Sequence, residues 1–330
     1  SMVATTFSAD TPTLVTDIVR KNGIAGNWVW WAFLLTGMLT VFVYARLWRR
    51  SGALTDIEFY ELRYSGKSAA FLRGFRALYL GFFFNVTIMA TVSLAAIKIG
   101  GIMLGLSPVD TVLWASGVTV VVAALGGLRA VLLSDFFLFS LSMAGAIAAA
   151  WFALGAPEVG GLDGLLAAPA IQDSLSFLPT LETGADGAYT TESLNVFVSV
   201  LVIPIAVQWW SVWYPSAEPG GGGYVAQRML AARNEKHARA AVLLFNALYY
   251  GMRPWPWIIV ALCSILVFPD LDSIGVAFPQ AHESIIIEDL AYPAMLQQTL
   301  PPGWLGLVVA SLLAAYISTL STHLNWGSSY

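Results

Sequence analysis

The chain has 330 residues, of which 58% are hydrophobic and 11% charged, with a net charge of −4. A soluble domain carries roughly 25% charged residues, so this composition excludes an ordinary soluble globular protein. Six stretches without Asp, Glu, Lys or Arg approach or exceed the ~20 residues that cross a bilayer. They are 27–45, 77–97, 111–128, 136–157, 193–217 and 301–330.

The apolar pattern predicts eight helices in an all-α, polytopic membrane protein. In chain order they cover 1–20, 27–47, 74–105, 109–127, 130–155, 193–217, 238–268 and 301–326. An even number of crossings puts both ends of the sequence on one side of the membrane. Because apolar segments lie at both ends, we also expect this sequence to be an internal fragment of a longer chain.

Positive charge assigns the orientation. Twelve basic residues fall in loops or helix ends on one face: Arg46, Arg49, Arg50, Arg63, Lys67, Arg73, Arg76, Arg129, Arg228, Arg233, Lys236 and Arg239. The pattern assigns only Arg20 and Lys21 to the other face, whose two long loops are acidic. Cytoplasmic loops carry the excess of Lys and Arg, so the basic face and both ends are predicted to be cytoplasmic.

Two of the eight segments carry residues that interrupt a membrane helix. The first contains the polar run Thr5–Pro12, and the sixth contains Pro204, Pro215, Pro219 and four consecutive glycines. Irregular backbone at membrane depth is tolerated where it is buried or lines a cavity, and paired broken helices point to a transporter's binding site. We therefore expect two inverted five-helix repeats within one transporter domain, 1–155 and, incomplete, 193–330.

Two carboxylates lie within predicted spans. Asp10 either caps the helix that restarts at Pro12 or handles an ion or solute. Asp135 lies about one turn into the fifth helix, where it either pairs with the nearby Arg129 or takes a functional part.

The last helix carries one polar face. Ser318, Ser321 and Thr322 recur at spacings of three and four residues, with Thr319 beside them. Single hydroxyls in membrane helices often bond to their own backbone. Four within five residues favour a site for a hard cation such as sodium, which binds neutral and anionic oxygens.

Other polar features favour structural interpretations. The glycine-rich stretch 220–223 lacks the Lys-Ser/Thr and the preceding strand of a phosphate loop, and Cys263 fills an apolar run. His323, near the cytoplasmic end of the last helix, is interpreted as a polar residue of the exit path rather than a proton carrier. No sequence pattern typical of an enzyme appears, so we expect no enzymatic activity.

Four motifs together resemble the sodium:solute symporter family, which includes sodium/proline and sodium/glucose symporters. They are Ala4–Asp10, Gly126–Val131 ahead of Asp135, Gln227–Ala232, and Ser318–Thr322 with Leu324-Asn325. They follow the family's order over nearly the whole sequence. The resemblance implies the inverted-repeat fold of the bacterial leucine transporter, with broken first and sixth helices.

The resemblance also implies site residues. A sodium site would use backbone oxygens of Ala4, Phe7 and Ala315 with the hydroxyls of Ser318 and Thr319. A second sodium site would use Asp135, Ser318, Ser321 and Thr322. For the solute, the matching first-helix positions are Thr6, Ser8 and Thr11, together with Asp10 and the aromatic residues Trp209, Trp210 and Trp213.

The predicted function is sodium-coupled symport of a small organic solute by alternating access. We expect the protein to lie in the plasma membrane, in bacteria the inner membrane, surrounded by the lipid bilayer. We expect it to bind neither nucleic acid nor an obligate protein partner. Two alternatives stay open: the membrane input domain of a signalling protein, and a proton-coupled carrier of the same fold.

Overall fold

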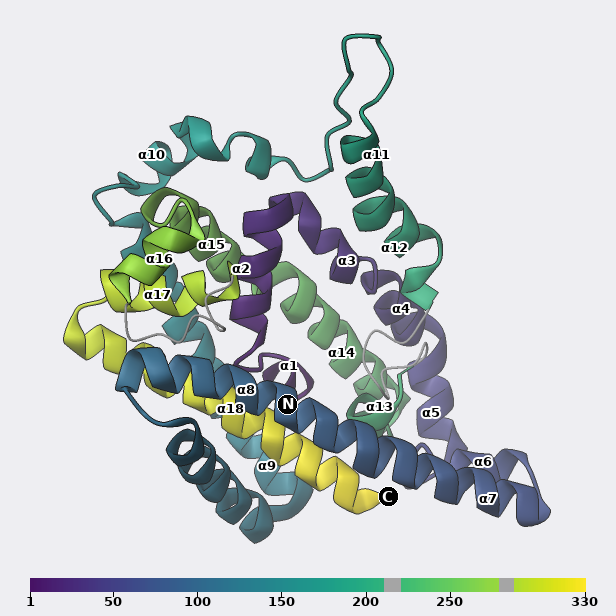
Figure 1. Cartoon of the computed structure of the whole chain (residues 1–330). Coiled ribbons are helices and arrows are strands. Elements are labelled where there is room, and N and C mark those ends of the chain that lie inside the picture. The colour runs from purple at the N-terminus through teal and green to yellow at the C-terminus, as the bar shows by residue number, and fades with distance from the viewer. Residues whose placement is uncertain (211–220, 279–287) are drawn as a thin grey trace.

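The computed structural model describes residues 1–210, 221–278 and 288–330, and within these ranges the chain is helical apart from loops and one isolated β-bridge, Thr183 to Tyr189 (Figure 1). The α-helices are α1 (Met2–Thr5), α2 (Thr11–Asn22), α3 (Trp28–Trp31), α4 (Leu34–Leu39), α5 (Ala45–Ser51), α6 (Phe59–Arg63), α7 (Gly66–Arg76), α8 (Asn85–Leu104), α9 (Pro108–Leu154), α10 (Gly161–Ala167), α11 (Thr191–Phe197), α12 (Ile203–Ala206), α13 (Gly223–Leu230), α14 (Glu235–Asn246), α15 (Trp255–Val267), α16 (Leu271–Ala277), α17 (Ala291–Thr299) and α18 (Pro302–Ser329).

Short π-helical and 3-10 segments continue several of these helices. The π segments are η2 (Thr40–Tyr44), η3 (Ala77–Phe84), η6 (Val198–Val202) and η8 (Ala247–Met252). The 3-10 segments are η1 (Ile24–Asn27), η4 (Pro169–Ile171), η5 (Asp173–Leu175), η7 (Gln208–Trp210) and η10 (Glu288–Leu290). Single π turns inside helices are frequent at functional sites.

Within the residues that the structure describes, five helices are long and apolar enough to cross a membrane, which confirms a multi-pass membrane protein. They are Ile24–Ser51, Gly66–Gly101, Gly127–Leu154, Glu235–Val267 and Pro302–Ser329. The other three predicted spans appear as the interrupted first segment and two shorter apolar helices, Pro108–Val121 and Thr191–Ala206. Large apolar side chains stay exposed on these helices, as on Phe82, Phe83, Phe136 and Phe137, because lipid rather than water surrounds them.

The predicted boundary between the fourth and fifth spans lies inside α9. Gly127 has φ 54° and ψ −165°, so α9 consists of two helices joined at a kink. A positive φ of this kind costs glycine little, whereas a Cβ would make it strained.

The first helix is broken, as its polar run predicts. α1 ends at Thr5 and α2 begins at Thr11 with Pro12 in its first turn, where a missing N–H costs nothing. The sixth helix leaves α-helical geometry after Ala206, and Val207 has φ −131° and ψ −49°. The rest of the predicted sixth span, 211–217, lies outside the described residues.

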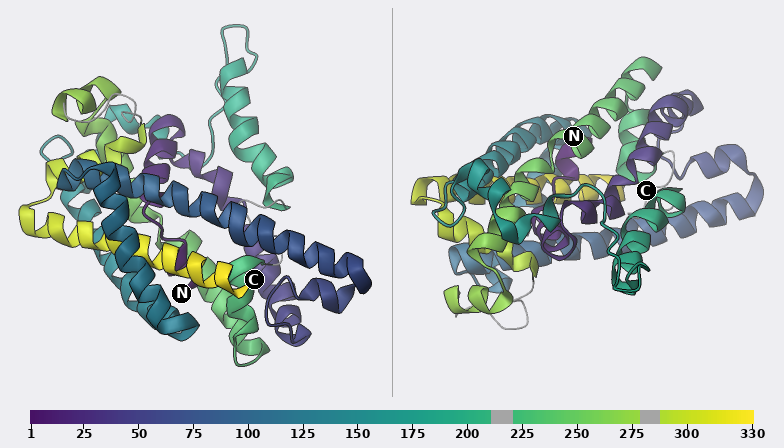
Figure 2. Two further views of the ribbon diagram at one scale, coloured as in Figure 1. Left: turned by 60° about the horizontal axis from the view of Figure 1, so that its bottom comes forward. Right: turned by 90° about the horizontal axis from the view of Figure 1, so that it is seen from above.

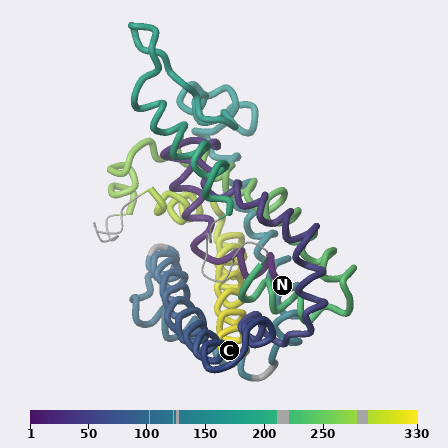
Figure 3. Tube along the Cα trace, turned by 90° about the vertical axis from the view of Figure 1, so that its right-hand side faces the viewer, coloured from purple at the N-terminus to yellow at the C-terminus, as the bar shows by residue number. Residues whose placement is uncertain are grey.

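α18 is the central helix of the bundle. It packs along α9, α8 and α1, and Figures 1 and 2 show it running beside α8. Figure 3 shows α18 in yellow at the centre, with the blue helices on one side and the first helices on the other. The hydroxyl face of α18 is therefore enclosed by protein.

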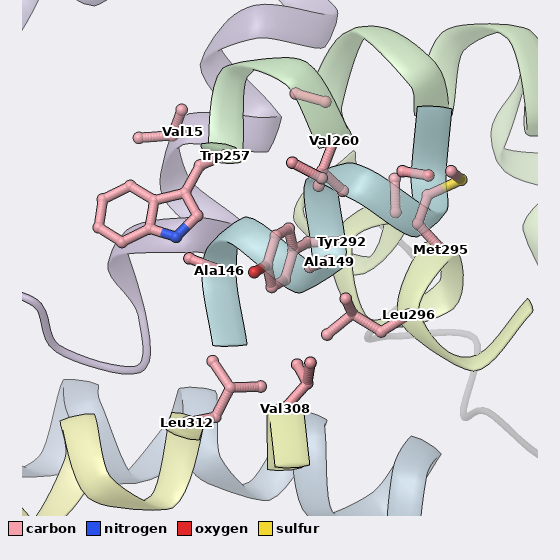
Figure 4. Packing of buried hydrophobic residues seen from close by; sticks show 14 of the residues in the cluster. Val15, Ala146, Ala149, Trp257, Val260, Tyr292, Met295, Leu296, Val308 and Leu312 are labelled. Atoms are coloured by element: carbon pink, nitrogen blue, oxygen red, sulfur yellow. The ribbon is translucent and has the colours of Figure 1, made fainter. Parts of the chain in front are cut away.

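The core fills the space between α9, α15, α17 and α18. Trp257, Tyr292 and Val308 are each at most 1% exposed, and Figure 4 shows them gathered around the small residues Ala146 and Ala149 of α9. Small residues allow membrane helices to approach closely, which compensates for the absence of a hydrophobic driving force in lipid.

Two ion pairs join η10 to α2 and α8. Arg20 pairs with Glu288 and also donates to the carbonyls of Ser264 and Phe268, both at 2.9 Å. Lys98 pairs with Asp289 at 2.6 Å. The sequence pattern assigned only Arg20 and Lys21 to this face, but Lys98 also lies there. Its long side chain allows a residue within an apolar helix to reach the end of the bundle.

The contact between α9 and α18 gives a stability prediction. Ser142 donates to the carbonyl of Ser311 at 3.0 Å, and a Cβ added at Gly145 would overlap the Ser311 side chain. We expect Gly145→Ala to destabilise the protein by about 1–3 kcal/mol, because overpacking forces the helices apart. Thermal unfolding in detergent measures this.

Gly117→Ala is the matched control, since Gly117 is a helical glycine on the other side of the α9 kink and its added Cβ meets no atom of the described residues within 4 Å. Equal midpoints for the two variants would show that this close approach is not needed.

Candidate functional site

The polar face of α18 is buried. Ser318, Thr319, Ser321, Thr322 and His323 are all at most 3% exposed. Buried hydroxyls in a membrane need hydrogen-bond partners, and most of these find them outside their own helix. The face therefore joins α18 to other elements.

Thr319 joins α18 to the break in the first helix. Its Oγ1 lies 2.7 Å from the carbonyl oxygen of Thr5 and 3.0 Å from that of Ala315. Ala4 and Phe7, at the two sides of that carbonyl, are 1% and 2% exposed, and the Phe7 N–H donates to the Ala4 carbonyl at 3.0 Å. Five residues are predicted for the first sodium site. The structure places the backbone of α1 and of its break beside two of them, Ala315 and Thr319.

Ser318, the fifth of those residues, points toward Asp135. The Asp135 carboxylate is fully buried and accepts hydrogen bonds from Ser318 at 2.6 Å and from Ser1 at 2.5 Å. Arg129, which sequence reasoning offered as an alternative partner, is exposed. The carboxylate therefore belongs to the buried network of α1, α9 and α18.

Arg228 of α13 closes this network at one end. Its guanidinium donates to Ser1 at 3.2 Å and to Thr322 at 3.1 Å, and Thr322 in turn accepts from Thr5 at 2.8 Å. Ser1 thus bridges Arg228 and Asp135. Sequence reasoning used Arg228 as part of a motif and as one of the basic residues of the predicted cytoplasmic face, but the structure shows it 7% exposed.

Ser321 differs from its neighbours. Its Oγ is buried and has no hydrogen-bond partner within residues 1–210, 221–278 and 288–330. Of the four residues predicted for a second sodium ion, Ser318 bonds directly to Asp135 and Thr322 is linked to it through Arg228 and Ser1. The Ser321 hydroxyl makes no hydrogen bond to either among the described residues.

A cavity of about 150 Å³ adjoins the network. The break supplies Thr6, Ser8, Asp10 and Thr11 to its lining, so the structure brings all four predicted first-helix solute residues together. Thr5 and Thr319 line it as well. Ion-site and solute-site candidates thus share one wall.

Arg253 is a cavity residue that sequence reasoning missed. It is 1% exposed, donates from Nη1 to the carbonyl of Thr6, and lies with its guanidinium 3.8 Å from the ring centroid of Tyr249 and 5.1 Å from that of Trp257. The available signal was a cation in the middle of the otherwise apolar span 238–268, since an intramembrane ionisable residue points to a functional site.

Trp209 and Trp210, two of the three predicted aromatic residues, lie away from this cavity. The Trp209 carbonyl accepts from Thr36, its ring contacts that of Trp210, and Trp210 is half exposed. Neither lines the cavity with the first-helix residues, and Trp213 lies outside the described residues. Their part in solute binding stays a prediction.

His323 also lines the cavity and has a fixed partner. Its Nδ1 lies 2.5 Å from Oδ1 of Asn85, whose amide donates to the His323 carbonyl at 2.9 Å. This double contact ties α18 to α8.

The chemistry of the site fits a hard monovalent cation. No cluster of three or more His, Cys, Asp or Glu side chains suited to a metal ion occurs in the part of the chain that the structure describes. The α18 network instead offers hydroxyls, carbonyls and one carboxylate, the ligand types that alkali ions share with other hard cations.

Comparison with known proteins decides the family. The model of the sodium:solute symporter family matches residues 1–330. The chain belongs to this family, which is one of transporters rather than enzymes.

Relatives in the family share a low sequence identity with the chain. The sodium/myo-inositol cotransporter 2 of Oryctolagus cuniculus is 27% identical over 64% of this chain and 31% of its own length. The sodium/glucose cotransporter 1 of the same organism is 23% identical over 93% of this chain and 47% of its own length. The chain spans less than half of these cotransporters.

A solved structure supports the fold. It is described as the substrate-bound outward-open state of a Na+-coupled sialic acid symporter, and it aligns with a TM-score of 0.68 at 18% identity. The alignment covers 99% of this chain and 62% of the other. The helical architecture of the symporter family is therefore present here.

The bridge from Asp135 to Arg228 gives a second stability prediction. Removing one partner of a direct buried ion pair costs about 3–5 kcal/mol because the other charge is left without compensation, and we expect a smaller loss here because Ser1 lies between the two charges. We expect Asp135→Ala and Arg228→Met each to lower the unfolding midpoint, and the double variant to lower it by less than the two losses together. Chemical or thermal unfolding of all four proteins measures this coupling. Additive losses would show that the two charges do not depend on each other.

Proposed function

We propose that the protein carries out sodium-coupled secondary active symport of a small organic solute across the plasma membrane, in a bacterial cell the inner membrane. The observation that carries this proposal is the shared wall. Thr5 and Thr319 hydrogen-bond across α1 and α18 and also line the cavity. An ion that draws α1 toward α18 would therefore shape the solute cavity directly.

The proposed sodium site uses the carbonyls of Ala4, Phe7 and Ala315 with the hydroxyls of Ser318 and Thr319. Three of its supports are physical: the break frees backbone oxygens, the residues are buried, and sodium prefers such oxygens. The family's name adds the fourth, because it implies sodium as the coupling ion.

A second sodium ion is proposed beside Asp135, with Ser318, Ser321 and Thr322. The carboxylate supplies negative charge in a fully buried place, and the unpaired Ser321 oxygen supplies a free ligand. A buried hydroxyl without a partner is costly, so a ligand that uses it is favoured.

The proposed solute site is the cavity at the break, with Thr6, Ser8, Asp10 and Thr11. The names of the relatives above mention three different solutes: myo-inositol, glucose and sialic acid. Family membership alone therefore does not identify the solute of this protein.

The proposed cycle is alternating access. Sodium binds between α1 and α18 and favours the state in which the cavity is complete, since an ion shifts an equilibrium by its difference in affinity for the two states. Solute closes the outer side, and loss of sodium to the cytoplasm releases it. Two inverted repeats, 1–155 and 193–330, would supply the moving parts, and the breaks after Thr5 and Ala206 support this division.

Uptake by the full-length protein in proteoliposomes tests the proposal. We expect an imposed sodium gradient to drive uptake from a panel of sugars, amino acids and carboxylates, and choline in place of sodium to abolish it. The double variant Ser318→Ala/Thr319→Ala should reduce sodium-driven uptake at least about tenfold, because each lost ligand weakens the ion site by 1–2 kcal/mol.

Uptake that ignores sodium would favour a proton-coupled carrier of the same fold. Uptake that needs sodium but ignores the double variant would move the ion site elsewhere.

Ser321→Ala tests the second sodium ion separately. The Oγ that this change removes has no hydrogen-bond partner among the described residues, so we expect the unfolding midpoint to stay the same or to rise slightly. The sodium dependence of uptake should shift to higher concentration and lose steepness. An unaltered sodium curve would contradict a second ion at this place.

A further inference from the structure

Two charged side chains of opposite sign line the solute cavity. Asp10 comes from the break in the first helix and Arg253 from the turn between η8 and α15. Neither takes part in an ion pair within the described ranges of the chain, although both face the same space. Opposite charges that share a cavity without pairing leave both available to a ligand.

Arg253 is held in place by groups that do not neutralise it. Nη1 donates to the carbonyl of Thr6, and the guanidinium lies 3.8 Å from the centroid of the Tyr249 ring. Its Nε is buried and has no hydrogen-bond partner in the part of the chain that the structure describes. A guanidinium that is 1% exposed and stacked on an aromatic ring has a fixed orientation with donors to spare.

This arrangement suits an anionic group with two oxygens. Arginine presents a planar fork of donors that matches a carboxylate and binds it through two parallel hydrogen bonds. A buried guanidinium without a counter-ion is costly, so binding of a carboxylate would remove a penalty as well as add contacts.

Asp10 supplies the complementary end. Its carboxylate accepts a hydrogen bond from Ser8 and is half-buried in the break. The charges of Asp10 and Arg253 cancel, so the cavity favours a solute with no net charge. A sugar would satisfy that condition but would leave both charges without a counter-charge.

We propose that the transported solute is a small zwitterion, an α-amino acid or a betaine, whose carboxylate binds Arg253 and whose ammonium group lies against Asp10. This inference rests on the proposed function and names the class of solute for the same cavity. Thr6 is the link to coupling, because its carbonyl holds Arg253 and its residue lies next to Thr5, which bonds to Thr319.

The test uses the full-length protein in proteoliposomes and, in parallel, solute-induced thermal stabilisation in detergent. The panel contains the α-amino acids, glycine betaine, glucose and myo-inositol. For the zwitterion that binds best, the matched amine without the carboxylate and the matched carboxylate without the amine are added as competitors. We expect the zwitterion to bind at least about 30-fold more tightly than either half-molecule, since an unsatisfied buried charge costs 2 kcal/mol or more.

Variants assign each end. Arg253→Gln should weaken the zwitterion and the carboxylate at least about 30-fold and leave the amine unchanged. Asp10→Asn should weaken the zwitterion and the amine and leave the carboxylate unchanged. Glu235→Gln removes a charge from the exposed pair with Arg50 and serves as the control that should change neither.

The outcomes separate this inference from the proposed function. Sodium-driven uptake of a sugar without binding of any zwitterion would overturn the inference and keep the symport proposal. Zwitterion uptake that needs no sodium would do the reverse. Binding of no zwitterion in the panel, or an equal loss of all ligands in Arg253→Gln, would also overturn it.

Discussion

The structure depends on how the break in the first helix is satisfied. Backbone carbonyls freed between Thr5 and Thr11 lie inside a membrane bundle, where water cannot solvate them. Thr319 of α18 contacts the Thr5 carbonyl, and Arg253 donates to the Thr6 carbonyl. This short irregular segment thereby contacts the candidate ion site through Thr319 and the charged side chain of the cavity, Arg253.

A path of hydrogen bonds extends from this segment to the motif around Gln227-Arg228. Thr5 bonds to Thr322, Thr322 accepts from Arg228, and Arg228 reaches Asp135 through Ser1. The motif around Gln227-Arg228 is therefore part of the buried network. A change of ion occupancy beside Asp135 would alter the contacts of Arg228, which gives the proposed release step a physical route to the cytoplasmic side.

Sequence alone predicted the elements whose signals are local. The apolar runs gave the membrane helices, the polar run before Pro12 gave the break, and the spacing of Ser318, Ser321 and Thr322 gave the buried face. It did not predict partners that come from distant parts of the chain. The bridge from Asp135 to Arg228 depends on how α13 folds back on α1, and Arg253 was overlooked because one cation barely changes the apolar character of its span.

Hydrogen exchange of the full-length protein in sodium and in choline tests the central claim most directly. If sodium binds the carbonyls at the break and draws α1 toward α18, the amides of residues 4–11 exchange more slowly in sodium, and Ser318→Ala/Thr319→Ala removes the difference. Equal exchange of these amides in both salts would contradict the account, because the ion would then not use the break.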